Sequence, residues 1–209
     1  MGKLIFCFIF VVVTSSANAA EVSSYINIGG LRLKDFSNGK PVARETGPVV
    51  ALGVSSRIPV SEHLDLDLKA EGQVGETDYF SYQKYSTEKT THYGFKLESL
   101  AVVPLTLGAV HLDPVAGAGG MFWGRSNAAR NHAEGYGVAG LNIGTALPKG
   151  QDLYMLGLAV IQAISGTTAQ PRVEAGVKTP GYLFNINYEK VRFKDADGSQ
   201  FGICFGKAF

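Results

Sequence analysis

The most regular pattern of apolar and polar positions in the chain runs from Leu64 to Val74 and reads LDLDLKAEGQV. In an extended strand, its leucines, alanine, glycine and valine lie on one face and its charged and amide side chains on the other. A strand of a soluble sheet usually ends after about 5 or 6 residues. This segment instead matches the roughly 9 to 11 residues that a tilted strand needs to cross a bilayer. The pattern therefore predicts a transmembrane strand with a lipid face and a lumen face.

Similar alternation recurs along the chain and predicts ten strands. We expect them at about 25–33, 50–60, 64–74, 92–103, 110–123, 136–147, 153–162, 172–178, 182–193 and 200–209. Two segments change face along their length, at Gly29-Gly30 and after Val138, and each change predicts a β-bulge. Ten is an even number, as closure of a bacterial barrel requires. Eight strands are the alternative, if a segment is miscounted.

The connections between these segments alternate between polar stretches and tight turns. The polar stretches follow the odd-numbered strands and cover residues 35–47, 76–91, 124–134, 163–170 and 195–199. This parity is expected of a barrel with long extracellular loops, short periplasmic turns and both termini in the periplasm. The predicted fold class is all-β, an antiparallel up-and-down transmembrane β-barrel. An exported soluble all-β domain is the alternative.

The N-terminal segment has the pattern of a signal peptide. Lys3 is followed by an apolar stretch at residues 4–13 and by the small-residue site Ala17-Asn18-Ala19. We therefore expect a signal peptide at residues 1–19 and an outer-membrane barrel domain at residues 20–209. Because Lys3 is the only charged residue of the leader, the mature chain keeps 18 basic residues against 18 acidic ones. Nothing in this balance points to nucleic acid, and no later apolar run has the length of a transmembrane helix.

Ten charged residues fall on the inward face of the predicted strands. Side chains fill the interior of a narrow barrel, so charges there must pair with one another. The hairpin registers place Arg57 opposite Asp67, and Arg172 opposite Glu189. We expect a lumen ion-pair network, with a selective pore lining as the alternative. Its members are Arg57, Asp65, Asp67, Lys69, Glu71, Lys96, Glu98, Arg172, Glu174 and Glu189.

Four other cationic residues are candidate contacts for lipopolysaccharide. Lys190 and Arg192 continue the outward face of their strand above its apolar part, and Arg125 and Arg130 lie in a neighbouring polar stretch. Arginine and lysine at that height can bind phosphate groups. Simple solvation of these side chains is the alternative.

The polar stretch at residues 76–91 is rich in aromatic residues. It contains Tyr79, Phe80, Tyr82 and Tyr85. Tyrosine gives a large contact area at low entropic cost, so the stretch predicts an extracellular ligand surface. A cap packed over the barrel is the alternative.

Two groups of residues have the types that catalysis uses. Ser126, His132 and Glu134 could supply a nucleophile, a base and an orienting acid at the extracellular rim. Lipid A deacylases of the PagL type carry a His-x-Ser-Asn motif that this chain lacks. His111 and Asp113 resemble half of the catalytic apparatus of omptin proteases, but they begin their strand near the periplasm, so we expect a structural pair. We assign no catalytic residue, cofactor or metal.

The last strand places Phe201, Ile203, Phe205 and Phe209 on one face. A chain that ends in this way resembles bacterial outer-membrane barrels, whose final strand is read by the barrel-assembly machinery. Phe205 and Phe209 match that assembly signal, while Lys207 departs from it. The segment from Asp113 to Gly120 is also similar to the P-x-x-G-x-G strand of small barrels like the transmembrane domain of OmpA.

The resemblance implies a β-barrel in the bacterial outer membrane with no catalytic residues carried over. We expect a structural or surface-interaction role without catalysis. The alternatives are a rim-sited lipid A acyl hydrolase and a narrow passive pore. The expected partners are outer-membrane lipid, lipopolysaccharide, the barrel-assembly machinery and an extracellular ligand.

Overall fold

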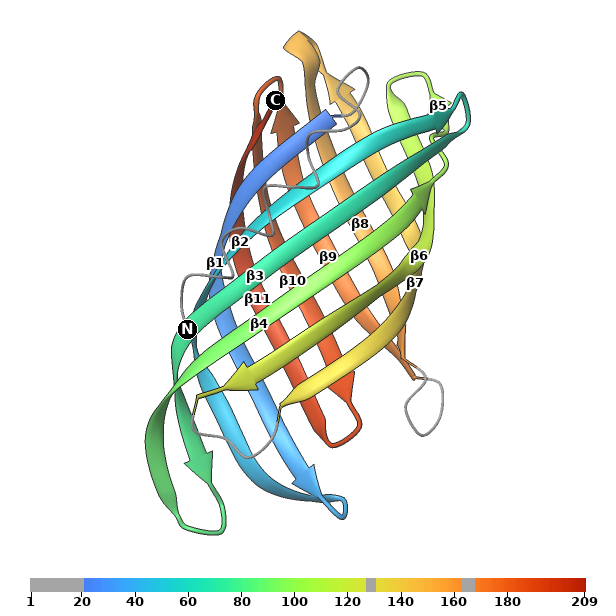
Figure 1. Cartoon of the computed structure of the whole chain (residues 1–209). Coiled ribbons are helices and arrows are strands. Elements are labelled where there is room, and N and C mark those ends of the chain that lie inside the picture. The colour runs from blue at the N-terminus through green and yellow to red at the C-terminus, as the bar shows by residue number, and fades with distance from the viewer. Residues whose placement is uncertain (1–20, 127–130, 163–167) are drawn as a thin grey trace.

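The computed structural model describes residues 21–126, 131–162 and 168–209, so the expected signal peptide lies outside the described residues. The described chain is almost entirely β-strand (Figure 1). Within these residues, no helix is long and apolar enough to span a membrane. The elements are β1 (Glu21–Ser37), β2 (Lys40–Ser61), β3 (Leu64–Ser81), β4 (Ser86–Val102), β5 (Thr106–Leu107), β6 (Val110–Arg125), β7 (His132–Leu147), the short 3-10 helix η1 (Pro148–Gly150), β8 (Gln151–Gln162), β9 (Thr168–Thr179), β10 (Tyr182–Phe193) and β11 (Ala196–Ala208).

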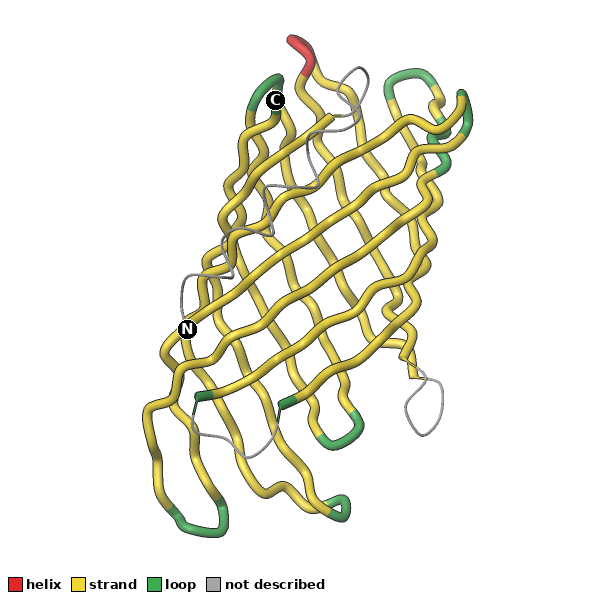
Figure 2. The backbone as a smooth tube through the Cα atoms, in the orientation of Figure 1, coloured by secondary structure: helices red, strands yellow, loops and turns green. Residues whose placement is uncertain are grey.

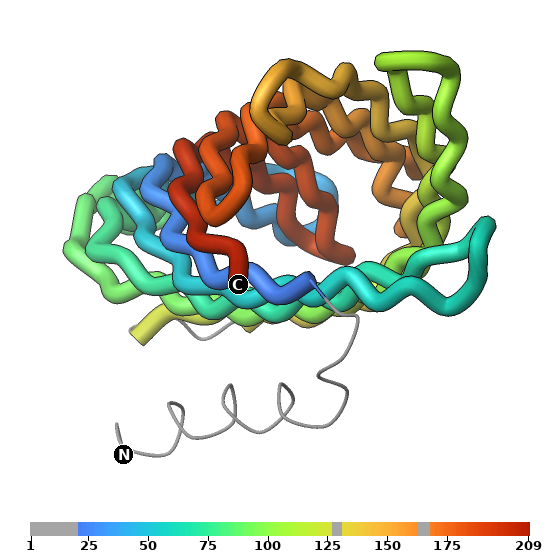
Figure 3. Tube along the Cα trace, turned by 90° about the horizontal axis from the view of Figure 1, so that it is seen from above, coloured from blue at the N-terminus to red at the C-terminus, as the bar shows by residue number. Residues whose placement is uncertain are grey.

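The strands form a closed antiparallel barrel. Each long strand pairs with its neighbours in the chain, and β1 pairs with β11. β4 pairs directly with β6, and the two-residue β5 lies in the connection between them. The ring of strands is visible along the barrel axis in Figure 3. Because β5 only lines the connection between β4 and β6, the wall has ten strands. The predicted ten-stranded up-and-down barrel is confirmed.

Both termini of the barrel lie at one end, which we call the terminal end. There the backbone amide of Phe209 donates to the carbonyl oxygen of Val22 at 2.9 Å. The turns at 62–63, 148–150 and 180–181 lie at the same end, and the β1–β2, β3–β4 and β10–β11 turns lie at the opposite, distal end (Figure 1). In bacterial barrels the terminal end faces the periplasm.

The polar stretches 35–47 and 76–91 are not loops, and this prediction was wrong. β1 and β2 continue through them to a two-residue turn at Asn38-Gly39, where both residues have positive φ. β3 and β4 likewise continue to Ser81 and Ser86. Figure 2 shows these strands projecting well beyond the rest of the distal end. We call residues 31–49 and 75–92 together the distal extension.

The two predicted β-bulges are also absent from their expected positions. β1 pairs with β11 in one register from Ser23 to Asp35, and β7 keeps one register with both of its neighbours. The register of β1 shifts instead between Asp35 and Phe36. The apparent change of face arises because Leu31 and Leu33 point into an apolar part of the lumen, while the lipid-facing residues of the same strand alternate with them.

The outer wall carries the apolar band expected of a membrane-spanning barrel. Its large exposed side chains are Ile26, Ile28, Val50, Leu52, Val74, Phe95, Leu97, Leu141, Ile143, Leu153, Met155, Phe184, Ile186, Ile203 and Phe205. Tyr93 and Phe122 stack at 5.9 Å on the distal side of this band, and Tyr182 and Phe209 are exposed near the terminal end. The band places the middle of the barrel in lipid.

Candidate functional site

The lumen contains the ten charged side chains that parity places inside, and each has a partner. At the terminal side, Arg57 binds Asp67 through two hydrogen bonds of 2.8 and 3.1 Å and lies 3.8 Å from Asp65. The β2–β3 register aligns Arg57 with Asp67 directly. The bidentate geometry is the strong form of an arginine–carboxylate pair.

A second group of charges crosses the middle of the barrel. Lys96 of β4 donates to both carboxylate oxygens of Glu189 on β10, at 2.7 and 2.6 Å. Glu98 accepts hydrogen bonds from Arg172 of β9 and from the hydroxyl of Tyr136, the latter at 2.8 Å. Two cations thus face two anions, and the pairs connect strands that are not neighbours in the sheet.

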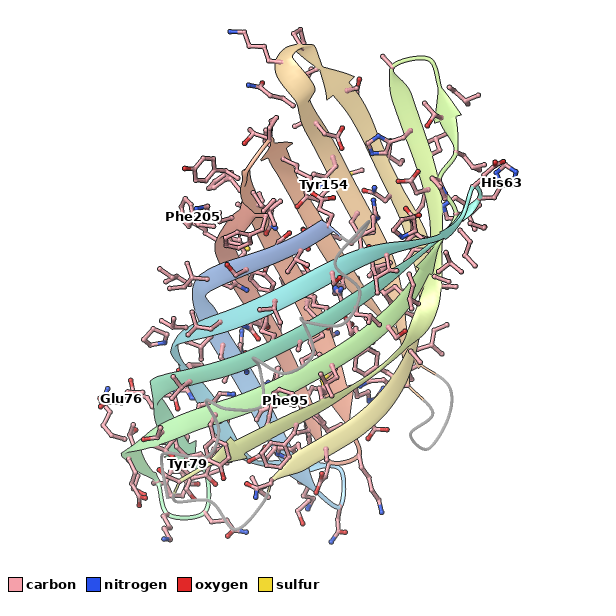
Figure 4. All side chains as sticks on the ribbon, turned by 45° about the horizontal axis from the view of Figure 1, so that its top comes forward. His63, Glu76, Tyr79, Phe95, Tyr154 and Phe205 are labelled. Carbon is pink, nitrogen blue, oxygen red and sulfur yellow. The ribbon has the colours of Figure 1, made fainter. Side chains whose placement is uncertain are left out.

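The remaining lumen charges are held by tyrosines. The Tyr25 hydroxyl donates to Glu71 at 3.0 Å, and the Lys69 ammonium lies 5.0 Å from the centre of the same ring. The Tyr154 hydroxyl donates to Glu174 at 2.6 Å. Tyr154 therefore points into the lumen (Figure 4).

These charges surround a polar cavity of about 460 Å³ in the terminal half of the barrel. Its lining runs from Lys96 and Glu189 in the middle to Glu21 and Thr106 at the terminal rim. Cys204 also lines it as a buried, small side chain. The cavity is large enough for several ordered waters.

An apolar layer fills the lumen on the distal side of the cavity. The rings of Trp123 and Phe193 contact each other in its centre, with 5.2 Å between their centroids and 59° between their planes. Trp123 is thus buried inside the barrel. The layer also contains Leu31, Leu33, Val49, Met121, Val138, Val160 and Val191, all of them buried.

A second ion-pair network lies beyond this layer, inside the distal extension. Arg125 donates to both oxygens of Asp35 at 2.8 and 2.9 Å, and its Nε lies 2.6 Å from Glu45. His132 lies 3.3 Å from Asp35, and His92 lies 3.2 Å from Glu45. All five side chains are almost completely buried. We call them the distal network.

The partners of the distal network hold its carboxylates in the charged form. Burial alone would raise the pKa of Asp35, but hydrogen bonds from His132 and Arg125 outweigh it and keep that pKa below its usual range. The pKa of Glu45 is lowered in the same way, against its burial, by hydrogen bonds from His92 and Thr77. The Arg125 guanidinium lies over the ring of Tyr79, 5.1 Å from its centre, which adds a cation–π contact to the network.

The structure separates the residues that the sequence grouped as candidate catalysts. Ser126 is exposed, and its hydroxyl accepts a hydrogen bond from the Thr91 amide at 3.1 Å, whereas His132 is buried in the distal network. His111 lies 3.6 Å from Asp152, while Asp113 accepts from Asn142 at 3.0 Å. In the described part of the chain, no three or more His, Cys, Asp or Glu side chains are arranged to hold a metal ion.

The candidate lipopolysaccharide contacts divide in the structure. Arg125 is buried in the distal network, so its prediction as a lipid contact was wrong. Lys190 and Arg192 are exposed on the outer wall, and Arg130 lies outside the described residues. Phe205 and Phe209, the candidate assembly signal, are exposed on the last strand and in the residue that follows it.

The comparisons with known proteins agree on the fold. A scan against protein-family models and a search of curated sequences found no match. The translocator domain of the autotransporter NalP from Neisseria meningitidis superposes with a TM-score of 0.56 at 10% identity, covering 94% of this chain and 90% of that one. The outer-membrane protease OmpT from Escherichia coli gives 0.54 at 9% identity, covering 92% and 96%. The β domain of the Bordetella autotransporter BrkA gives 0.51 at 15% identity, covering 92% and 100%.

These similarities concern the fold alone, because all three identities are low. They agree with two observations made on the chain itself, namely the closed ten-stranded wall and the apolar exterior band. By its fold, the chain is therefore an outer-membrane β-barrel, and its apolar exterior is the surface with which such barrels span the bacterial outer membrane.

Proposed function

We propose that the protein is a closed outer-membrane barrel whose distal extension binds an extracellular partner, and that it neither conducts solutes nor carries out catalysis. The order of side chains along the lumen supports the proposal that the barrel does not conduct solutes. On β1, Asn27 of the cavity is followed by Leu31 and Leu33 of the apolar layer and then by Asp35 of the distal network. A hydrated ion would have to pass an apolar layer and then a paired network.

The proposal that the distal extension binds a partner rests on the shape and chemistry of the β3–β4 hairpin. Its strands continue in regular register to the turn, so they present a stiff surface and not a loose loop. Near the turn, Phe80 and Tyr82 contact edge to face at 5.1 Å, and Tyr85 is 84% exposed at the tip. Exposed rigid aromatics lose little entropy on binding, which suits a contact surface. Figure 4 shows Tyr79 and Glu76 at this distal end.

Recording from planar bilayers tests the closed lumen. The purified full barrel should give no steps of current above the bare bilayer, and a well-studied open porin reconstituted in parallel confirms that insertion is detected. Reproducible ohmic steps from the wild-type protein would replace the proposal with the narrow pore.

Binding assays test the extracellular role. The full barrel in detergent is applied to arrays of immobilised glycans and purified extracellular-matrix proteins, beside a variant with Phe80, Tyr82 and Tyr85 replaced by serine. The proposal expects at least one specific signal that the variant loses. A matched variant at the terminal end, Tyr182→Ser, should keep that signal. Identical signals from all three proteins would remove the hairpin from the proposal.

The enzymatic alternative is supported less by the geometry. Ser126 is exposed and its hydroxyl accepts a hydrogen bond from the Thr91 amide, while His132 is buried and lies 3.3 Å from Asp35. Among the described residues, the serine hydroxyl and the histidine ring are not joined by a hydrogen bond, as a nucleophile and its base would be. Mass spectrometry of lipid A from cells that make the protein should therefore give the same acyl pattern as cells that lack it. A lost acyl chain would favour the hydrolase.

A further inference from the structure

Five cations lie in two adjacent rows on the outer wall. The register aligns Lys190, Ser199, Arg32 and Thr46 as one row across β10, β11, β1 and β2. The same register aligns Arg192, Asp197, Lys34 and Arg44 as the next row toward the distal end. We call Arg32, Lys34, Arg44, Lys190 and Arg192 the basic patch.

The basic patch directly follows the apolar band on the same four strands. The rows below it, toward the terminal end, are Tyr188, Phe201, Gly30 and Pro48, then Ile186, Ile203, Ile28 and Val50. Neighbouring strands are about 4.8 Å apart, so each row is about 14 Å wide. A molecule with acyl chains and anionic groups could therefore lie along this face, with its acyl chains against the apolar rows and its anionic groups against the basic patch.

The patch has a strong excess of positive charge, and few carboxylates lie in it or beside it. Asp197, 3.5 Å from Arg192, is the one carboxylate within the two rows. On the adjacent strand β3, Asp78 lies beside the patch, but it forms an ion pair with Lys89 of β4 at 2.9 Å. The Arg44 guanidinium lies over the Phe80 ring, 5.2 Å from its centre, and the residue is exposed. Like charges held this close repel one another, so an anion that bridges them is favoured.

We infer that the basic patch binds the phosphate groups of a glycolipid in the outer leaflet, that is, lipopolysaccharide. The guanidinium and ammonium groups would hold the phosphates by charge-assisted hydrogen bonds. The acyl chains of the same molecule would pack against the isoleucines of the rows below. This inference rests on the position of the barrel in the outer membrane and does not depend on the proposed extracellular partner.

The height of the patch favours this ligand over a soluble anion. The cations sit where the apolar exterior ends, at the level of lipid headgroups. Lys190 and Arg32 lie only one row beyond Tyr188 and Gly30. The two chemistries together fit an amphiphile with phosphates at its headgroup.

The test measures binding of fluorescently labelled lipopolysaccharide to the purified barrel in a zwitterionic detergent by anisotropy. A variant with all five cations of the patch replaced by glutamine removes the charge and keeps most of the side-chain length. The control variant replaces two exposed lysines outside the patch, Lys84 at the β3–β4 turn and Lys149 at the terminal end. A two-site variant, Arg32→Gln with Lys190→Gln, serves if the five-site variant does not fold. Heat-modifiable mobility on an SDS gel confirms folding in each case.

The expected result is a loss of affinity of about tenfold or more in the patch variant, since each charge-assisted bond to phosphate is worth about that factor. The control variant should bind like the wild type, and lipopolysaccharide stripped of its phosphates should bind as weakly as the patch variant does. Equal losses in patch and control variants would overturn the inference, as would undiminished binding of the dephosphorylated lipid. Phosphatidylglycerol that competes as well as lipopolysaccharide would overturn the choice of ligand.

Discussion

Arg125 of β6 holds the carboxylate of Asp35 on β1 through two parallel hydrogen bonds of 2.8 and 2.9 Å, although the two residues are 90 positions apart in the chain. The same guanidinium reaches Glu45 on β2 at 2.6 Å. Because all three side chains are buried, neither carboxylate can turn to water if the cation is lost. The pair therefore couples opposite parts of the distal wall.

Replacement of Arg125 by glutamine should destabilise the barrel strongly. It leaves Asp35 and Glu45 as buried charges with a lost partner, which typically costs about 3–5 kcal/mol. The midpoint of urea unfolding in lipid vesicles measures the effect. Arg32→Gln is the matched control, because Arg32 is exposed on the outer wall of the same extension, and it should change stability by less than about 0.5 kcal/mol. Equal stability of the two variants would contradict the role of the network.

The distal network should also make stability depend on pH. The pKa values of Asp35 and Glu45 are lower in the folded barrel than in the unfolded chain. Their contribution is then complete above the ordinary carboxyl pKa of about 4 and is lost as the pH falls through the folded values. The difference in unfolding free energy between the wild type and Arg125→Gln should therefore become smaller as the pH is lowered from about 6 to about 3, a range that spans the ordinary carboxyl pKa. A gap that stays constant over this range would show that these carboxylates do not titrate with folding.

The membrane part of the barrel could be predicted from local patterns. The alternation from Leu64 to Val74 lies within β3, which begins at Leu64 and continues to Ser81. Parity alone sorted Arg57 and Asp67 into the lumen, and a short turn fixed their register. Both inferences needed only the period of a strand and the length of a hairpin.

The distal extension could not be predicted in the same way. Distal to Leu33 and Val49, its strands are mostly polar on both faces, because the inner face holds buried ion pairs while the outer face meets water. Asp35 and Glu45 read as loop residues, since their partner Arg125 is distant in sequence. The sequence does contain one indication that the strand continues, because the inward positions Leu31, Leu33 and Asp35 follow one another at the spacing of a strand. The sequence reading instead placed a bulge before Leu31 and ended the strand at Leu33.

Opening the apolar layer should turn the closed barrel into a conductor. Trp123 and Phe193 are the largest side chains at its centre, and their rings contact each other at a centroid distance of 5.2 Å. Replacing both with glycine should join the polar cavity to the polar distal network, so that no apolar barrier remains in the lumen, and should give measurable current steps in planar bilayers. A control with Ile28 and Ile203 replaced by glycine removes comparable apolar groups from the lipid face and should remain silent. A folded double variant without conductance would mean that the distal network alone seals the lumen.

Removal of the hairpin tip should leave the barrel intact. Residues 82–85 connect β3 and β4 beyond the last paired residues, Ser81 and Ser86. Replacing them with Asn-Gly supplies a two-residue turn suited to antiparallel strands. Heat-modifiability and the unfolding midpoint should match the wild type, while any binding that depends on Tyr85 is lost. A large loss of stability would indicate that the tip is structural and not an interaction surface.

The glycine at position 53 makes room for an aromatic ring inside the lumen. Tyr25 lies across from Gly53 in the β1–β2 register and covers it, so a Cβ added at Gly53 would overlap the tyrosine ring. Gly53→Ala should therefore displace Tyr25, break its hydrogen bond to Glu71 and cost about 1–3 kcal/mol. Gly72→Ala is the control, because a Cβ there meets open space.

A double-variant cycle decides whether the ring causes that cost. In a Tyr25→Ala background, Gly53→Ala should be nearly neutral, since the alanine then occupies space that the ring has left. The two substitutions are in direct contact, so their effects on the unfolding free energy should not add. Additive effects would place the strain in the backbone of β2 and not in the packing of the tyrosine over the glycine.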